Sequence, residues 1–189
     1  MFAFGTNFFR NMVYSDPNWQ QQTFDPDRDP TVASHRLSST LDSINPDLSV
    51  FQKRGGKLIV YHGWSDPAIP SANAIRYYDS VDKKMSAKAA AEFVRLYMVP
   101  RTGDCGGGAS QRVRQAATPD ADRFHSADAA LEAWVEQGSA PAEIIATKYK
   151  DSKPCAPVER TRPICPWPQT AHYKGTGSTD DASRFSCAK

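Results

Sequence analysis

The sequence has no long hydrophobic run and no excess of charge of either sign. None of the apolar stretches in its 189 residues approaches the roughly 20 residues that a membrane-spanning helix requires. The 23 basic side chains nearly balance the 21 acidic ones, and they form no basic run or stripe. We therefore expect neither a membrane nor a nucleic acid as a partner.

Features of a signal peptide and of a metal site are also missing. Residues 1–14 have no basic segment, no continuous apolar stretch and no small-residue cleavage site. The four cysteines show no C-x-x-C spacing and no histidine at metal-ligand spacing, so we expect no metal. Disulfides are the better interpretation, and they indicate an oxidising compartment. That compartment conflicts with the missing signal peptide unless the natural N-terminus lies elsewhere.

Composition along the chain indicates one partial domain with three parts. Fourteen prolines are concentrated at both ends and indicate coil around a smaller regular core. We expect a coil-rich lead-in over residues 1–54, with a short helix at 32–41, then a βαβ and helical core over 55–147. A coil-rich, cysteine-containing tail over 148–189 follows. The expected fold class is α/β.

The core begins with an apolar run from Leu58 to Tyr61, which is typical of a strand buried on both faces. Apolar residues at helical spacing, from Ile75 to Met85, predict a helix with Ser71 as its cap. A second apolar run at 93–99 predicts a parallel partner strand, which makes a βαβ unit. Another helical stripe follows Ser126 and ends at Gly138.

Asp66 follows the first strand and precedes Pro67. Ligands and catalytic groups gather at the carboxyl ends of strands in open α/β sheets, and Asp66 would lie there. The alternative interpretation is that Asp66 is a turn former before a proline. On these residues alone, both interpretations stay open.

Six sequence blocks together resemble one family. They are Gly55-Gly-Lys-Leu-Ile-Val-Tyr-His-Gly-Trp-Ser-Asp66, Phe93-Val-Arg-Leu-Tyr-Met-Val-Pro100, Cys105-Gly-Gly-Gly108, Ala133-Trp-Val-Glu-Gln-Gly-Ser-Ala-Pro141, Arg162-Pro-Ile-Cys-Pro-Trp-Pro168 and Phe185-Ser-Cys187. In this order they are similar to the C-terminal portion of the tannase/feruloyl esterase family. The resemblance implies the last two parallel strands of an α/β-hydrolase fold with flanking helices.

By this resemblance, the chain would be the C-terminal segment of a serine esterase that cleaves aromatic-acid esters. Asp66 matches the family's triad acid, which orients the histidine that activates the serine. Asp104 stands where the family has that histidine, and the nucleophilic serine motif lies outside this sequence. A carboxylate facing Asp66 gives no general base near neutral pH. We therefore expect this chain alone to be inactive.

The family resemblance also extends to the cysteines and to calcium. It implies that Cys165 pairs with Cys187 and ties down the tail, whereas Cys105 has lost its family partner. Cys105 is either free or paired with Cys155. The family's calcium site lies in a lid absent here, so no cofactor is expected. The implied location is secreted or periplasmic.

Two functions remain open at this point. The first is a C-terminal segment of an ester hydrolase, with an aromatic-acid ester as substrate once an N-terminal half completes it. The alternative is a degenerate, non-catalytic binding or interaction module that docks its aromatic start on another chain. Because two buried strands cannot cover their own edges, we expect the chain alone to be marginally stable or prone to aggregate.

Overall fold

The computed structural model describes residues 2–100, 122–153 and 156–189. The chain divides into two compact units, Met1–Asn45 and Pro46–Lys189. The boundary falls inside the expected lead-in of residues 1–54. Within the described ranges, no helix is both long and apolar enough to cross a membrane.

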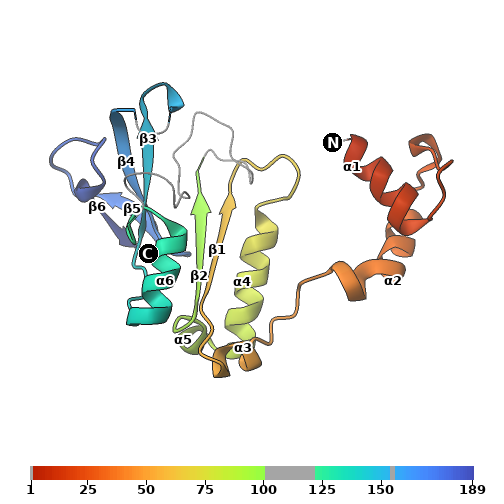
Figure 1. Cartoon of the computed structure of the whole chain (residues 1–189), viewed down its shortest axis with the longest axis horizontal. Helices are drawn as coiled ribbons and strands as arrows, with labels where there is room; N and C mark the ends of the chain where they lie inside the picture. The colour runs from red at the N-terminus through yellow and green to blue at the C-terminus, as the bar shows by residue number, and fades with distance from the viewer. Residues whose placement is uncertain (1, 101–121, 154–155) are drawn as a thin grey trace. The chain divides into compact units, whose positions relative to one another are not determined.

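The N-terminal unit is mainly helical, so the expectation of a coil-rich lead-in is wrong for this part (Figure 1). Its elements are α1 (Phe2–Asn7), the π-helix η1 (Phe8–Val13), the 3₁₀ helix η2 (Gln21–Thr23) and α2 (Asp29–Leu41). Pro30 does not prevent α2, because it lies in the first turn. A proline there loses no helical hydrogen bond.

Two kinds of contact hold this unit together. Four aromatic rings lie against one another, with Phe9 in contact with Tyr14, Trp19 and Phe24 at centroid distances of 6.5, 5.4 and 5.1 Å. Beside them, Asp29 is 0% exposed. Phe9 and Tyr14 of the aromatic start are therefore used within this unit, whereas Phe4 is exposed.

The second unit is built around the predicted βαβ element. Its first elements are α3 (Ser49–Lys53), β1 (Leu58–Gly63), α4 (Ala72–Met85), α5 (Ala87–Ala90) and β2 (Val94–Val99). β1 and β2 are parallel, with Leu58 opposite Val94 and Gly63 opposite Val99. This confirms the two strands and the helix between them.

Alternate residues of the two strands face two different apolar clusters. Residues such as Val60 and Leu96 pack with Tyr78 and Val81 of α4. Residues such as Tyr97 pack instead toward the start of the next helix and the following hairpin. Apolar side chains on both faces are what a sheet covered on both sides requires.

The two strands nevertheless differ in burial. All of β2 is buried apart from Arg95, whereas Leu58 to Tyr61 of β1 are only partly buried. The expectation of full burial for β1 is therefore wrong in this chain. In the described residues β1 has β2 as its neighbour on one side, while β2 has a further bridge from Tyr97 to Pro166 on its other side.

The remainder of this unit contains more strands than the sequence analysis predicted. The elements after β2 are α6 (Ala127–Gln137), β3 (Ile144–Tyr149), the 3₁₀ helix η3 (Lys150–Ser152), β4 (Val158–Ile164), β5 (Thr170–Tyr173), the 3₁₀ helix η4 (Ala182–Arg184) and β6 (Phe185–Ala188). β3 with β4 and β5 with β6 form two antiparallel pairs. The expected coil-rich tail is thus partly sheet. Proline is tolerated in edge strands, and both strands of a two-stranded sheet are edge strands. Pro163 accordingly lies in β4 opposite Ile145.

The end of the tail and the ends of α6 agree with prediction. Cys165 and Cys187 form a disulfide with their Cα atoms 5.5 Å apart. The hydroxyl of Ser126 accepts from the Ala129 N–H at the start of α6, and Gly138 closes the helix in the left-handed conformation at φ 67°.

Candidate functional site

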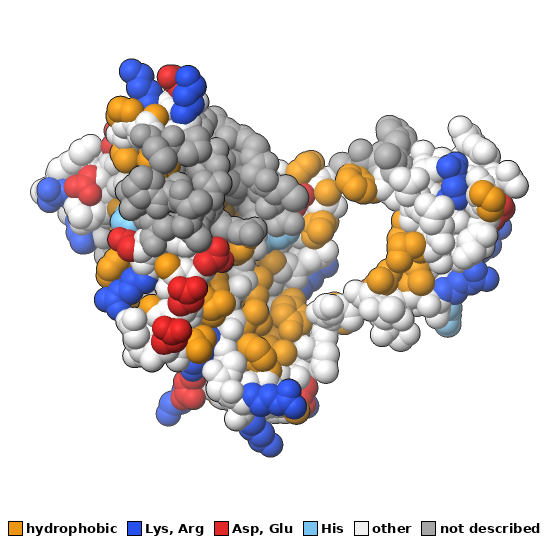
Figure 2. Space-filling model, viewed as in Figure 1, with side chains coloured by type: hydrophobic (Ala, Val, Ile, Leu, Met, Phe, Trp, Pro, Cys, Tyr) orange, Lys and Arg blue, Asp and Glu red, His pale blue; other side chains and the backbone are white. Residues whose placement is uncertain are grey.

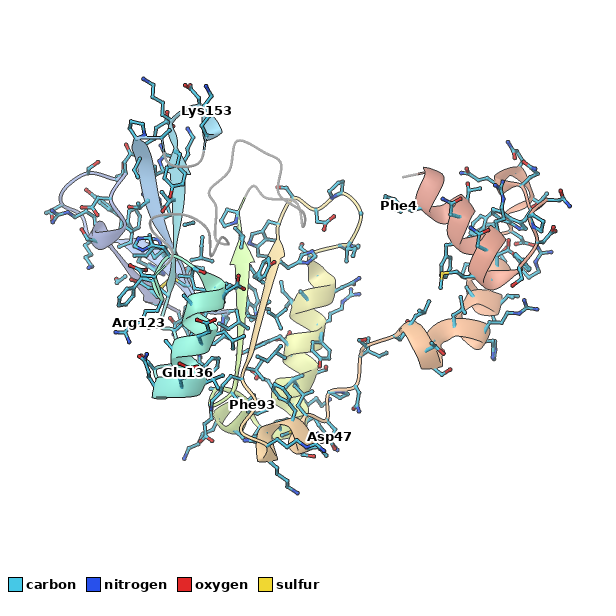
Figure 3. The ribbon with its side chains drawn as sticks, in the orientation of Figure 1. Phe4, Asp47, Phe93, Arg123, Glu136 and Lys153 are labelled. Atoms are coloured by element: carbon cyan, nitrogen blue, oxygen red, sulfur yellow. A yellow bond between two sulfur atoms is a disulfide. The ribbon has the colours of Figure 1, made fainter. Side chains whose placement is uncertain are left out.

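The candidate site lies at the carboxyl end of β1. The arrowheads of β1 and β2 in Figure 1 mark this end. Figure 3 shows Phe93 at the opposite end of the same sheet, where β2 begins. β1 ends at Gly63, and the next N–H, of Trp64, donates to the carbonyl oxygen of Val99 at 3.0 Å. The loops that follow the two strands therefore start side by side.

Asp66 organises the loop between β1 and α4. Its Oδ1 accepts from the N–H groups of Ala68 at 2.7 Å and Ile69 at 3.1 Å. Its own N–H donates to the Gly63 carbonyl at 3.4 Å. The turn-forming interpretation of Asp66 is confirmed, and its expected position after the strand end is confirmed too. Its catalytic role stays a prediction.

Ser71 is at the predicted N-cap position of α4, but its side chain makes no capping hydrogen bond. The Asn73 N–H bonds instead to the Pro70 carbonyl at 2.9 Å. Ser71 has helical backbone angles, φ −56° and ψ −29°, rather than the extended ones typical of a capping residue. The prediction of Ser71 as a cap is therefore wrong in its side-chain role.

His62 is the other polar side chain at this strand end. It is 8% exposed, and its Nε2 lies 3.1 Å from the carbonyl oxygen of Ile69. Because a carbonyl oxygen can only accept, the Nε2 atom carries the proton and donates. The His62 ring therefore makes a structural hydrogen bond to the Asp66 loop, with the Ile69 carbonyl oxygen as its acceptor.

Several predicted site residues lie outside the described residues. These are Asp104, Cys105 and Cys155. β2 ends at Val99, and this end lies beside the start of the Asp66 loop. Asp104 belongs to the segment that begins there, and its relation to Asp66 stays a prediction.

An aromatic pair near Asp66 was not anticipated from the sequence. Trp64 is 46% exposed, and its ring lies edge-on to Trp167 at a centroid distance of 6.4 Å. Trp167 is held against β2, because its N–H donates to the Leu96 carbonyl at 2.7 Å. The available signal in the sequence was a tryptophan close to proline at each of the two positions. It could not predict the contact, because the two tryptophans are distant in the sequence.

The remaining histidines lie away from the Asp66 loop in the sequence, and two of them have partners of their own. His125 Nδ1 lies 2.8 Å from Asp122 Oδ1. Partial burial raises the pKa of Asp122, but the bonds from His125 and from backbone N–H groups lower the pKa overall. His172 contacts Thr170 at 3.0 Å, and His35 is exposed.

The described residues also fit no metal. They contain no group of three or more His, Cys, Asp or Glu side chains arranged to hold an ion.

Comparison with known proteins gives the family. The model of the family described as tannase and feruloyl esterase matches residues 3–188. The chain therefore belongs to the tannase and feruloyl esterase family, whose named members include ester hydrolases.

Three relatives illustrate the similarity. An uncharacterised esterase of Xanthomonas campestris is 42% identical over 95% of this chain and 35% of its own length. The mono(2-hydroxyethyl) terephthalate hydrolase of Piscinibacter sakaiensis is 37% identical over 87% of this chain and 26% of its own length. The crystal structure of feruloyl esterase B from Aspergillus oryzae has a TM-score of 0.86 and 28% identity, covering 99% of this chain and 38% of that one. The chain thus spans about a third of the length of the relatives it matches.

Proposed function

We propose that this chain is the C-terminal segment of a carboxylic ester hydrolase of the α/β-hydrolase fold and supplies the catalytic aspartate, Asp66. The observation that carries the proposal is the position of Asp66 in a hydrogen-bonded loop directly after β1, beside the end of the parallel strand β2. In a triad, the acid holds the imidazole in the required tautomer and stabilises its charged form. A carboxylate beside the exit of the next strand fits that role.

The exposed side of β1 supports a larger sheet. Residues Leu58 to Tyr61 are only partly buried, although their composition is that of a central strand. Figure 2 shows hydrophobic side chains gathered over β1 and α4 on the face in view. Large exposed apolar patches mark surfaces that another polypeptide covers. The remaining two thirds of an esterase of the relatives' length would supply that cover.

The substrate we propose is an ester of an aromatic acid. Trp64 offers a half-exposed indole two residues before Asp66, and Trp167 supports it from the side. Aromatic rings pack favourably in edge-to-face and offset geometries. The relatives named feruloyl esterase support the same class of substrate.

We further propose that the chain is catalytically inactive by itself and needs no cofactor. By the family resemblance, the serine motif would lie outside this sequence, and Asp104 stands at the position of the triad histidine. A secreted or periplasmic location is supported by the disulfide between Cys165 and Cys187, because disulfides persist in oxidising compartments.

The test is a chimera in which this chain replaces the matching segment of feruloyl esterase B from Aspergillus oryzae. We expect no hydrolysis of methyl ferulate by the isolated chain or by the chimera with Asp104. The variant Asp104→His in the chimera should restore hydrolysis. Adding Asp66→Asn should then lower kcat by roughly 10⁴-fold. Adding the exposed Asp79→Asn of α4 instead serves as the matched control and should change little.

A folded Asp104→His chimera that hydrolyses no ester would contradict the proposal. It would favour the alternative function, a non-catalytic interaction module. Phe4 supports that alternative, because it is 77% exposed and projects from α1 (Figure 3).

A further inference from the structure

We infer that His62 is a positioning residue for Asp66, acting through the backbone of Ile69. This inference rests on the proposed catalytic role of Asp66. It concerns how the carboxylate is held in place, and it gives the buried histidine at the end of β1 a function in the reaction.

Packing does not hold the loop that carries Asp66. Every residue from 64 to 70 is exposed except Asp66, which is half-buried. Ile69 is itself 48% exposed, so burial of its side chain does not fix its backbone. The conformation of the loop must therefore depend mainly on hydrogen bonds.

The two backbone groups of Ile69 are bound from opposite sides. Its N–H donates to Asp66 Oδ1 at 3.1 Å, and its carbonyl accepts from His62 Nε2 at 3.1 Å. Ile69 also precedes Pro70, which restricts its backbone to extended conformations. A residue held at both ends transmits a displacement of one partner to the other.

His62 is the rigid partner in this arrangement. It belongs to β1, it is 8% exposed, and it lies opposite Met98 of β2. Without its bond, the Ile69 carbonyl loses the His62 donor, and we expect the Ile69 N–H to shift relative to Asp66. Of the two N–H bonds that Asp66 Oδ1 accepts in this loop, the one from Ala68 would then remain. Displacements of about 1 Å in a catalytic group can cost roughly 10²-fold in rate.

Amide substitutions at position 62 test this with matched chemistry. The nitrogen of Gln reaches about as far as the Nε2 of histidine, whereas that of Asn stops one methylene short. In the 189-residue chain, we expect His62→Ala and His62→Asn to lower hydrogen-exchange protection of the Ile69 amide roughly fivefold, the equivalent of one hydrogen bond. They should also shift the carboxyl ¹³C resonance of Asp66. His62→Gln should restore both signals, and the exposed His172→Ala should leave them unchanged.

A measurement on the unaltered chain keeps the inference testable if the variants unfold. The ¹⁵N shifts of His62 must show a proton on Nε2. A neutral ring protonated on Nδ1 alone cannot make the bond and would overturn the inference.

Kinetics in the active chimera separate this inference from the proposed function. With Asp104→His present, His62→Asn should lower kcat at least roughly tenfold with KM nearly unchanged, and His62→Gln should recover most of it. An active chimera whose kcat is unchanged by His62→Asn overturns the inference alone. An inactive chimera in which His62→Asn still releases the Ile69 amide overturns the proposed function, while the positioning contact stands.

Discussion

Two aspartates, one in each unit, are held in opposite ways. Asp29 of the N-terminal unit is completely buried, and it accepts from Tyr14 Oη at 2.6 Å, Arg28 Nε at 2.7 Å and the Asp25 N–H at 3.1 Å. Asp66 is half-buried, and its Oδ1 accepts from N–H groups of its own loop. The first carboxylate joins segments into a unit, whereas the second shapes a local turn at the end of a strand.

The comparison contrasts the surroundings of a structural carboxylate with those of the carboxylate that we propose to be catalytic. Hydrogen bonding from Arg28 lowers the pKa of Asp29 to about 2, although burial by itself would raise it. Such a group is charged at all physiological pH values and is enclosed by its partners. A triad acid needs a fixed orientation and also a side from which an imidazole can approach. A loop-bound carboxylate at a strand end fits the second requirement.

The largest effect should come from removing the charge of Asp29. We expect Asp29→Asn to unfold the N-terminal unit, because an amide NH₂ group would face donors in a fully buried position. Most cross-peaks of residues up to Asn45 in a ¹H–¹⁵N spectrum should collapse to random-coil positions. Asp66→Asn should leave the spectrum of strands β1 and β2 intact.

The exposed Asp42→Asn at the end of α2 is the control for this experiment. If Asp29→Asn kept the dispersed spectrum of the control, the buried network would contribute little to folding. The contrast between the two aspartates would then be lost.

Acid should weaken the N-terminal unit through the same group. The folded-state pKa of Asp29 is about 2, below the ordinary 3.8, so folding favours the carboxylate. Its contribution is therefore complete above about pH 4 and is lost as the pH falls toward 2. Monitoring Trp19 in a chain whose other tryptophans are replaced by Phe should show unfolding across this window. A transition that finishes above pH 5 would point to another group.

The disulfide should matter for the larger unit and not for the N-terminal one. Replacing both Cys165 and Cys187 by Ser opens a loop of sequence separation 22. We expect the free energy of unfolding of the larger unit to fall by roughly 3 kcal/mol. Urea denaturation followed at β5 and β6 measures this change, with the exposed Ser186→Ala as the control. An equal loss in both units would mean that they unfold together.

The smallest effect compares two serines at helix starts. Ser126 is fully buried and caps α6, so Ser126→Ala should cost about 1 kcal/mol of unfolding free energy. Ser71 makes no such bond, so Ser71→Ala should stay within about 0.5 kcal/mol. Urea denaturation of both variants measures the two losses of unfolding free energy. Equal losses would show that a serine contributes through its position at the helix start and not through the capping hydrogen bond.

Much of the core was predictable because its signals are local. Apolar runs give β1 and β2, and the helical spacing from Ile75 to Met85 gives α4. The predicted short helix at 32–41 lies within α2. The other helices before Asn45 and the hairpins after α6 were missed, since proline content was taken as evidence of coil. Proline is compatible with a first helical turn and with an edge strand, and which positions qualify depends on the fold.

The sequence by itself determined the βαβ unit, the position of Asp66 after a strand and, through family resemblance, the pairing of Cys165 with Cys187. Each of these follows from a contiguous pattern or a recognisable motif. Tertiary structure alone decided that Asp29 is buried among its partners and that His62 meets the carbonyl of Ile69. The physical reason is that burial and hydrogen-bond partners depend on where the folded backbone brings each group, and neither is encoded in the spacing of residue types.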